Sequence, residues 1–409
     1  MHTPKILRSY ADTPKEVKYL IYASIMPSVA YGLIFTDISY FLTIVQGVTA
    51  EFTGLIISLM GISTFVASIF LGIAADVYGR KKLLVMGNIL ASVILVVFVL
   101  TTNPILLITV AILEGISEAA VLTSSSALLA DKAEDNNRTS AFSLYGFVQS
   151  IAFGLGSFAI PSIIIFEFVG FSNKESHILL YSSIAILSGV FTLIMLRVSE
   201  SKKLKKHGSG VRSLLPGKSK VVLLKFTFTS AVLAFGAGMF VPLMAYWFNL
   251  QYGISDIISG PILAISSLLI ALATLVAPYL AVRLGLVKSI VLTQAVSTLF
   301  MFAIPFSPNY ALAGFIYSMR ALLMNMASPL SQSMIMGLVA EDERGAASGI
   351  SGALWRLPNA LSTFIGAWLM GIGLLAEPFL IGGLFYIVSI ILFWIYFRGV
   401  KLPEEKIAG

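Results

Sequence analysis

The sequence contains no cysteine, so disulfide bonds and thiol chemistry are excluded and the redox compartment cannot be inferred. Charged residues are also scarce, at 11% of the 409 residues, against roughly 25% in ordinary soluble domains. Long polar stretches are correspondingly few. A chain this poor in charge is not typical of a soluble enzyme.

Motifs for nucleotide or metal chemistry are missing as well. There is no GxGxxG pattern and no phosphate-binding loop, and the three histidines lie outside the apolar runs. We therefore expect no enzyme activity, no cofactor and no metal site. The net charge of +7 does not indicate nucleic-acid binding, because the basic residues are spread over short loops.

The sequence is rich in long apolar runs. Hydrophobic residues make up 57% of the chain, and twelve runs are each long enough to cross a hydrocarbon core of roughly 30 Å. A backbone in lipid must satisfy its own hydrogen bonds, so an all-α integral membrane protein is predicted. The expected spans are residues 18–46, 52–77, the next run to 101, 105–130, 139–166, 178–196, 221–250, 256–282, 286–306, 310–339, 346–373 and 378–397.

The two halves of the chain resemble each other at an offset of 206 residues. This offset pairs Gly54 with Gly260 and Gly79 with Gly285, and three further identities follow it. Parallel repeats of this kind are typical of transporters. The predicted organisation is a cytoplasmic tail (1–17), a six-helix bundle (18–198), a basic cytoplasmic linker (199–220), a second six-helix bundle (221–398) and a cytoplasmic tail (399–409).

The turn after the second span carries a family pattern. Its residues Gly72, Asp76, Gly79, Arg80 and Lys81 resemble the loop between spans two and three of the major facilitator superfamily, with Val77 where arginine is usual. The resemblance implies two pseudo-symmetric bundles around a cavity that opens alternately to each side. It also implies that these five residues form a gate, in which Asp76 packs against the start of span eleven. The cations Arg80–Lys82 are expected to meet the acids of Glu341–Glu343, or else only to fix the orientation of the chain in the membrane.

Ionisable residues inside spans are costly, and each is a candidate for function. Glu114 and Glu118 share a helix face four residues apart, and two carboxylates in a low dielectric resist ionising together. They are candidates for proton or substrate handling, or else form a static pair. Asp37 is a similar candidate, unless Tyr31 and Tyr40 satisfy it by hydrogen bonding.

The second half carries arginines in place of acids. Arg320 and Arg356 keep their charge, so each needs a permanent partner or a hydrated cavity. They are expected to contact an anionic substrate or a coupling carboxylate, or else to form an ion pair that braces the fold. Asn325 and Asn359 are candidates for the same cavity, although polar side chains also join helices.

Taken together, these features predict a secondary active transporter that moves a small molecule by alternating access. Proton coupling is expected, with the proton gradient as the energy source and antiport (efflux) favoured. The alternatives are a proton-coupled symporter that imports an organic anion, sugar or other metabolite, and a transporter-like sensor or scaffold. The expected partners are substrate, protons and membrane lipids, without nucleic acid, for a monomer in the cell membrane.

The positive charges predict the topology. Of the 27 Lys and Arg, Lys174 alone is expected outside and Arg320 and Arg356 lie within spans, which leaves 24 on the cytoplasmic side. Reporters fused after residue 409 or placed within 200–218 should therefore report cytoplasm, and a reporter within 167–176 should report the outside. Opposite locations for the linker and the carboxyl terminus would rule out twelve spans.

Overall fold

The computed structural model describes residues 14–133, 138–200, 219–339 and 344–399. The side chain of Asp76 lies outside the description, although its backbone belongs to a helix. Most of the linker, the two ends of the chain and Glu341–Glu343 also fall outside it.

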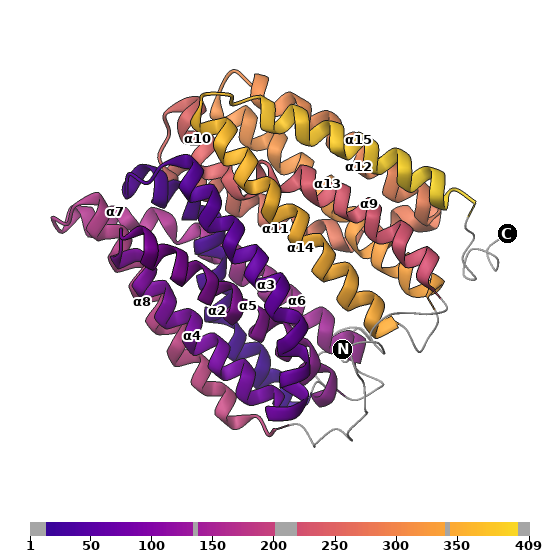
Figure 1. The fold of residues 1–409 in the computed structure, drawn as a ribbon, viewed down its shortest axis with the longest axis horizontal. Coiled ribbons are helices and arrows are strands. Elements are labelled where there is room, and N and C mark those ends of the chain that lie inside the picture. Colours follow the sequence, from indigo (N-terminus) through magenta and orange to yellow (C-terminus); the bar gives the residue numbers. More distant parts are fainter. Residues whose placement is uncertain (1–13, 134–137, 201–218, 340–343, 400–409) are drawn as a thin grey trace, which may run out of the picture. The chain divides into compact units, whose positions relative to one another are not determined.

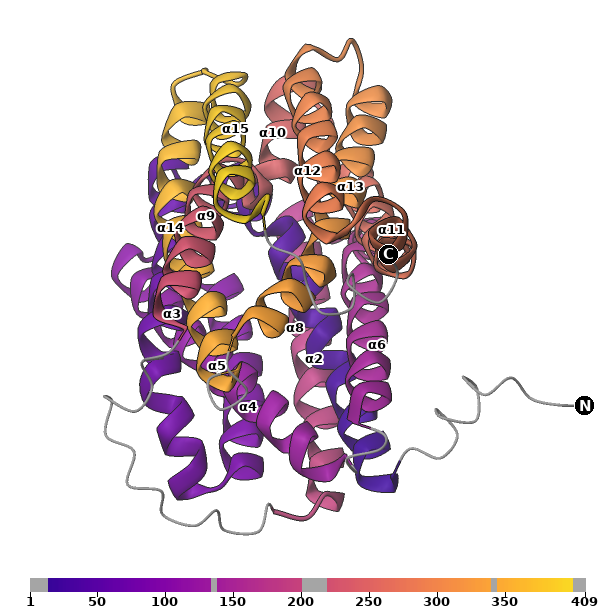
Figure 2. The ribbon, with the colours of Figure 1, turned by 90° about the vertical axis from the view of Figure 1, so that its right-hand side faces the viewer.

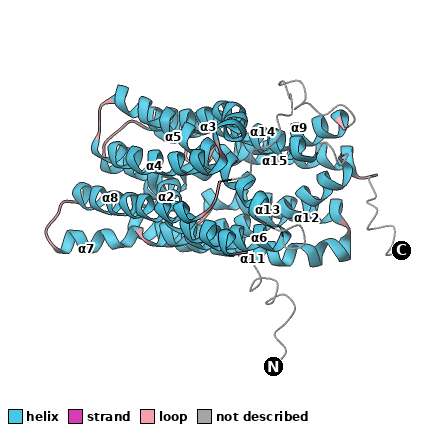
Figure 3. Cartoon of the chain, turned by 90° about the horizontal axis from the view of Figure 1, so that it is seen from below, coloured by secondary structure: helices cyan, strands magenta, loops and turns pink. Residues whose placement is uncertain are grey.

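Within the described residues the chain is helical and has no strand (Figure 3). The twelve long helices are α2 (Lys15–Tyr40), α3 (Ala50–Tyr78), α4 (Arg80–Leu100), α5 (Pro104–Lys132), α6 (Arg138–Phe158), α8 (Asn173–Thr192), α9 (Lys220–Gly238), α11 (Asp256–Leu284), α12 (Leu286–Ala303), α13 (Tyr310–Leu338), α14 (Arg344–Gly371) and α15 (Glu377–Phe397). Two short helices, α7 (Ile163–Phe168) and α10 (Met244–Tyr252), extend α6 and α9.

These helices match the predicted spans. Counting described residues alone, ten helical segments are long and apolar enough to cross a membrane, and α13 and α14 are of similar length. The expectation of an all-α membrane protein with twelve spanning helices is confirmed.

Local signals explain several helix ends. Asn103 caps α5 by accepting hydrogen bonds from the backbone N–H groups of Ile105 and Leu106, with Pro104 at the first helical position. Ser172 and Glu175 form a reciprocal capping box at the start of α8. Both signals are visible in the sequence.

The repeat is also present in the backbone. Gly79 joins α3 to α4 with φ of 110°, and Gly285 joins α11 to α12 with φ of 82°. Both values lie in a region that residues with a Cβ rarely adopt. The same sharp turn therefore recurs at equivalent places in the two halves.

One compact unit comprises Met1–Val48, Leu59–Lys206 and Asp256–Ala264. In this unit α2 packs against α6 and α8, and α4 packs against α5 and α8 (Figure 1). Glycines let α2 and α6 touch backbone to backbone: a Cβ on Gly32 would lie 2.0 Å from the carbonyl oxygen of Phe153, and one on Gly156 would lie 2.1 Å from that of Val29. Lipid tails are as apolar as the helix surfaces, so the hydrophobic effect does not drive helices together within a membrane. Small residues allow the close packing on which helix association then depends.

The other unit comprises Thr49–Ser58, His207–Ser255 and Ile265–Gly409. Here α9 packs against α14 and α15, and α12 packs against α13 (Figure 2). The contact between α9 and α14 again depends on glycine, because a Cβ on Gly238 would lie 2.0 Å from the carbonyl oxygen of Asn359.

The close contact between α2 and α6 can be tested with Gly32→Ala. The added methyl group meets the backbone of Phe153, so we expect a loss of roughly 1–3 kcal/mol in the free energy of unfolding. Gly146→Ala is the matched control, since a Cβ on Gly146 in α6 meets nothing within 4 Å and alanine favours a helix by about 1 kcal/mol. Thermal unfolding in detergent measures both. Equal melting temperatures for the two variants would contradict the backbone contact.

Candidate functional site

The two glutamates of α5 each contact a hydroxyl group. Glu114 and Glu118 are partly buried. The Oγ of Ser117 lies 3.3 Å from a carboxylate oxygen of Glu114, and the Oγ1 of Thr64 lies 2.9 Å from Oε2 of Glu118. The structure thus brings the two predicted acids together and adds a hydroxyl partner to each.

A glycine places Thr64 beside Glu118. A Cβ on Gly115 would lie 2.3 Å from the carbonyl oxygen of Met60 and 2.8 Å from the backbone nitrogen of Thr64. Only a residue without a side chain allows α3 to approach α5 this closely. The threonine of α3 therefore reaches the glutamate one turn further along α5.

Asp37 is fully buried in α2 and accepts a hydrogen bond of 2.8 Å from the hydroxyl of Tyr181 in α8. The tyrosines expected from the sequence, Tyr31 and Tyr40, do not make this bond. Tyr31 is 40% exposed and packs on Phe35 and Phe153 instead. The sequence expectation for the partner was wrong because the hydroxyl comes from another helix.

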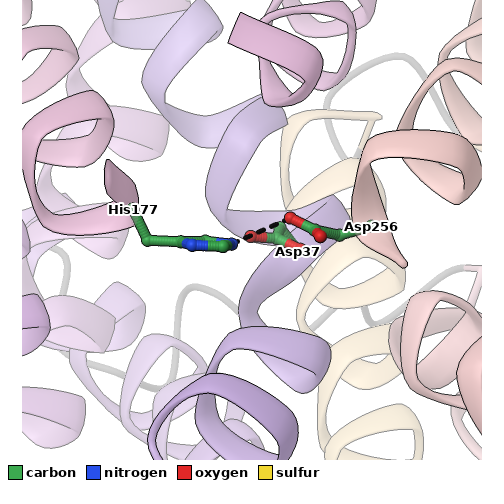
Figure 4. A group of neighbouring side chains, drawn as sticks. All are labelled: Asp37, His177 and Asp256. Atoms are coloured by element: carbon green, nitrogen blue, oxygen red, sulfur yellow. Dashed lines mark hydrogen bonds and ion pairs between the residues drawn. The ribbon is translucent and has the colours of Figure 1, made fainter. Parts of the chain in front are cut away.

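Asp37 belongs to a cluster with His177 of α8 and Asp256 of α11 (Figure 4). All three side chains are buried, and one ligand atom from each lies within 4.8 Å of the others. Nε2 of His177 lies 2.9 Å from Oδ2 of Asp256, and Nδ1 lies 2.7 Å from the carbonyl oxygen of Asn173. Oδ1 of Asp37 and Oδ1 of Asp256 have no hydrogen-bond partner.

The expectation that no histidine lies in a span was also wrong. His177 is a buried residue of α8, within a segment that can cross a membrane. The apolar run begins only at Ile178, so hydropathy alone excluded it. The Ser172 to Glu175 capping pattern does mark the helix start four residues earlier and could have identified His177.

Arg320 of α13 is buried against aromatic rings. Its guanidinium carbon lies 4.8 Å from the centroid of Phe240 and 5.4 Å from that of Tyr386, and its Nη2 donates a hydrogen bond to the hydroxyl of Tyr386. Within the described part of the chain, Arg320 forms no ion pair with an acid. Cation–π contact and one hydroxyl take the place of the expected carboxylate.

The other predicted residues of the second half bond to backbone. Asn325 donates to the carbonyl of Ala321 in its own helix, and Asn359 donates to the carbonyl of Ala234 in α9 at 3.2 Å. Arg356 is a partly buried residue of α14. Substrate contact by these three residues stays a prediction.

The basic turn has partners that the sequence analysis missed. Arg80 forms an ion pair of 2.7 Å with Asp131, and the backbone N–H groups of Lys81 and Lys82 donate to the carboxylate of Glu200 at 3.0 and 3.3 Å. A carboxylate is favourable there because the start of α4 carries partial positive charge.

A gate at this turn stays a prediction. A Cβ on Gly72 would meet nothing within 4 Å, whereas one on Gly79 would meet the carboxylate of Glu200. The expected contacts of Asp76 and of Glu341–Glu343 lie outside the described residues.

Known proteins resemble this chain over most of its length. A family model for the Major Facilitator Superfamily matches residues 20–327 and 226–409. Multidrug resistance protein 2 of Bacillus subtilis (strain 168) is 22% identical over 367 residues, or 88% of this chain and 89% of that protein. Quinolone resistance protein NorA of Staphylococcus aureus (strain MRSA252) is 27% identical over 217 residues, or 52% of this chain and 53% of that protein.

A solved structure has the same fold. The crystal structure of nucleoside transporter NupG matches with a TM-score of 0.74 at 17% identity, covering 95% of this chain and 100% of that chain. At this identity the match concerns the fold alone.

The environment of Arg320 generates a prediction about stability. Tyr386→Phe removes the hydroxyl that accepts a hydrogen bond from the buried guanidinium of Arg320. We therefore expect the free energy of unfolding of this variant to be lower by about 1–3 kcal/mol. Tyr317→Phe is the control, because Tyr317 is also a buried tyrosine and lies on α13, the helix that carries Arg320. Thermal unfolding of both variants in detergent measures this difference, and equal stability of the two variants would contradict a stabilising hydrogen bond between Arg320 and Tyr386.

Proposed function

The chain belongs to the major facilitator superfamily, and on this basis we propose that it is a proton-coupled secondary transporter that exports small molecules by alternating access. That it is a multi-pass membrane transporter, and not an enzyme, follows from the family and the fold. Coupling to protons, the direction of transport and the role of each residue are the proposal.

The contact between Thr64 and Glu118 carries the proposal of proton coupling. The Oγ1 of Thr64 lies within hydrogen-bond distance of two oxygens, the carbonyl of Met60 at 2.8 Å and Oε2 of Glu118 at 2.9 Å. A hydroxyl has one hydrogen to donate and two lone pairs that accept. It can therefore satisfy Glu118 in either protonation state.

The two states differ by the direction of one hydrogen bond. When Glu118 is ionised, the Thr64 hydroxyl donates to its carboxylate. When Glu118 is protonated, its own O–H donates to Thr64, whose hydrogen then turns to the carbonyl of Met60. In both protonation states every donor and acceptor of this contact keeps a partner, so Glu118 can take up and release a proton without leaving a buried polar atom unsatisfied.

Glu114 influences the uptake and release of the proton at Glu118. It lies one turn from Glu118 on the same helix, and two carboxylates in a low dielectric repel each other when both are ionised. Binding of one proton to the pair relieves the repulsion. The pair can thus alternate between one and two negative charges during the cycle, so Glu118 carries the proton and Glu114 makes its release and uptake sensitive to the local environment.

Export is supported by two observations. The relatives named Multidrug resistance protein 2 and Quinolone resistance protein NorA point to efflux of foreign compounds. The alternative, import of an organic anion, would use Arg320 or Arg356 to bind the substrate, and of these two Arg320 is already engaged by Phe240 and Tyr386. In the export cycle, a proton on Glu118 accompanies the return of the carrier after the substrate has been released.

The variant Glu118→Gln tests the coupling. Glutamine resembles the protonated acid permanently, so the variant should lose accumulation against a gradient by at least about tenfold and lose its pH dependence. Exchange of labelled for unlabelled substrate should persist, because exchange requires no change of protonation. Inverted membrane vesicles with an imposed pH gradient, screened first with a panel of drug-like cations on the unmodified protein, measure both properties.

Glu175→Gln serves as the control, since Glu175 is an exposed capping residue far from α5 in the sequence. Normal accumulation and pH dependence in Glu118→Gln would assign the proton to another acid. Loss of exchange together with accumulation would make Glu118 a substrate contact and not a proton carrier.

A further inference from the structure

The hydrogen bonds of His177 leave one contact unexplained. The carbonyl oxygen of Asn173 can only accept, so Nδ1 of His177 must carry the hydrogen of that 2.7 Å bond. In the neutral ring Nε2 then presents a lone pair. It faces Oδ2 of Asp256, another acceptor, at only 2.9 Å. Two acceptors at this distance repel each other unless a cation lies between them, either the proton of an imidazolium that forms an ion pair with Asp256 or a metal ion.

The two carboxylates of the cluster also have too few hydrogen-bond donors and too little compensating positive charge. Asp37 and Asp256 are both 0% exposed, and Oδ1 of each has no hydrogen-bond partner. The hydroxyl of Tyr181 is a single neutral donor, and within the described residues neither acid pairs with a lysine or arginine. Two buried carboxylates without a compensating cation are costly.

We propose that Asp37, His177 and Asp256 bind one divalent transition-metal ion of the Zn²⁺ type. An imidazole nitrogen and two carboxylate oxygens are ordinary ligands for such an ion. Ligand atoms bound to one Zn²⁺ ion lie about 3–4 Å from one another, and the three groups here offer atoms within 4.8 Å of one another. Small rotations of the two carboxylates close the remaining gap.

The surroundings of the cluster fit metal ligands. A histidine that binds a metal usually donates its other N–H to a carbonyl or carboxylate, as Nδ1 of His177 does to Asn173. Ligating carboxylates are in turn held by hydrogen bonds, as Asp37 is by Tyr181. The ring of Phe41, 5.7 Å from that of His177 and 5.2 Å from that of Tyr181, covers one side of the site.

A divalent ion compensates the negative charge of the cluster more completely than a single proton does. A proton between His177 and Asp256 leaves one negative charge and two unpartnered Oδ1 atoms. A divalent ion neutralises both carboxylates and supplies the missing partner to each. It also links the first turn of α11 to α2 and α8, within the unit to which residues 256–264 belong.

Cobalt(II) is a suitable probe, because its visible absorption reports the bound ligands. The full chain, purified in detergent with a tag free of histidine and treated with a chelator, is equilibrated overnight with Co²⁺. We expect one Co²⁺ per chain, displaced by Zn²⁺, with a rise in melting temperature. His177→Asn and Asp256→Asn should each weaken binding at least about 100-fold and abolish that rise.

His207→Asn is the matched control, since it removes a histidine that is not one of the three proposed ligands and should bind Co²⁺ like the unmodified protein. Substoichiometric binding by the unmodified protein would overturn the proposal and leave protons as the occupants. Undiminished binding by His177→Asn would overturn it too. Should Asp256→Asn fail to fold, the stoichiometry of the unmodified protein and His177→Asn still decide. None of these measurements depends on transport, so the outcome is independent of the coupling proton.

Discussion

Polar groups inside the spanning helices must find their partners within the protein, because hydrocarbon offers none. Most hydroxyls meet this constraint locally. Thr123 and Ser92 donate to carbonyls one turn earlier in their own helices, for example. Such side chains make no demand on the fold. The informative residues are those whose partners lie on other helices, because they determine which helices must come together.

The same constraint explains why Arg320 and Glu118 have different surroundings. Arg320 cannot lose its proton, and the protein surrounds it with aromatic faces and the hydroxyl of Tyr386. Glu118 can change its charge, and it contacts a threonine hydroxyl that serves either state. The permanent charge is thus buried among aromatic rings, whereas the carboxyl group lies beside a hydroxyl that can either donate or accept a hydrogen bond.

Glycine connects packing to chemistry in this chain. Gly115 brings α3 close enough to α5 for Thr64 to reach Glu118, and Gly32 and Gly156 bring α2 against α6. Association of helices in lipid depends on such close fits, since lipid tails are as apolar as the side chains. A substitution far from any acid can therefore disturb the acid's environment by separating two helices.

Much of the fold could be predicted from the sequence. Apolar runs longer than the hydrocarbon thickness must be helices, so the twelve spans follow from local composition. The sharp turns at Gly79 and Gly285 also follow from local residue types and from the repeat. Of the candidate site, the sequence identified Asp37, Glu114, Glu118 and Arg320 as buried or partly buried ionisable residues, because a charge within an apolar run is visible without any knowledge of neighbours.

Partners were decided by the tertiary structure alone. Tyr181 and Asp256 lie 144 and 219 positions from Asp37 in the sequence, and no local pattern says that three helices bring them together. His177 escaped notice because it stands at the edge of an apolar run, where hydropathy does not distinguish a buried end from a hydrated one. Composition determines which groups must be satisfied, since that depends on the solvent around each helix. Which groups satisfy them depends on helix packing, and that is set by contacts between residues far apart in the chain.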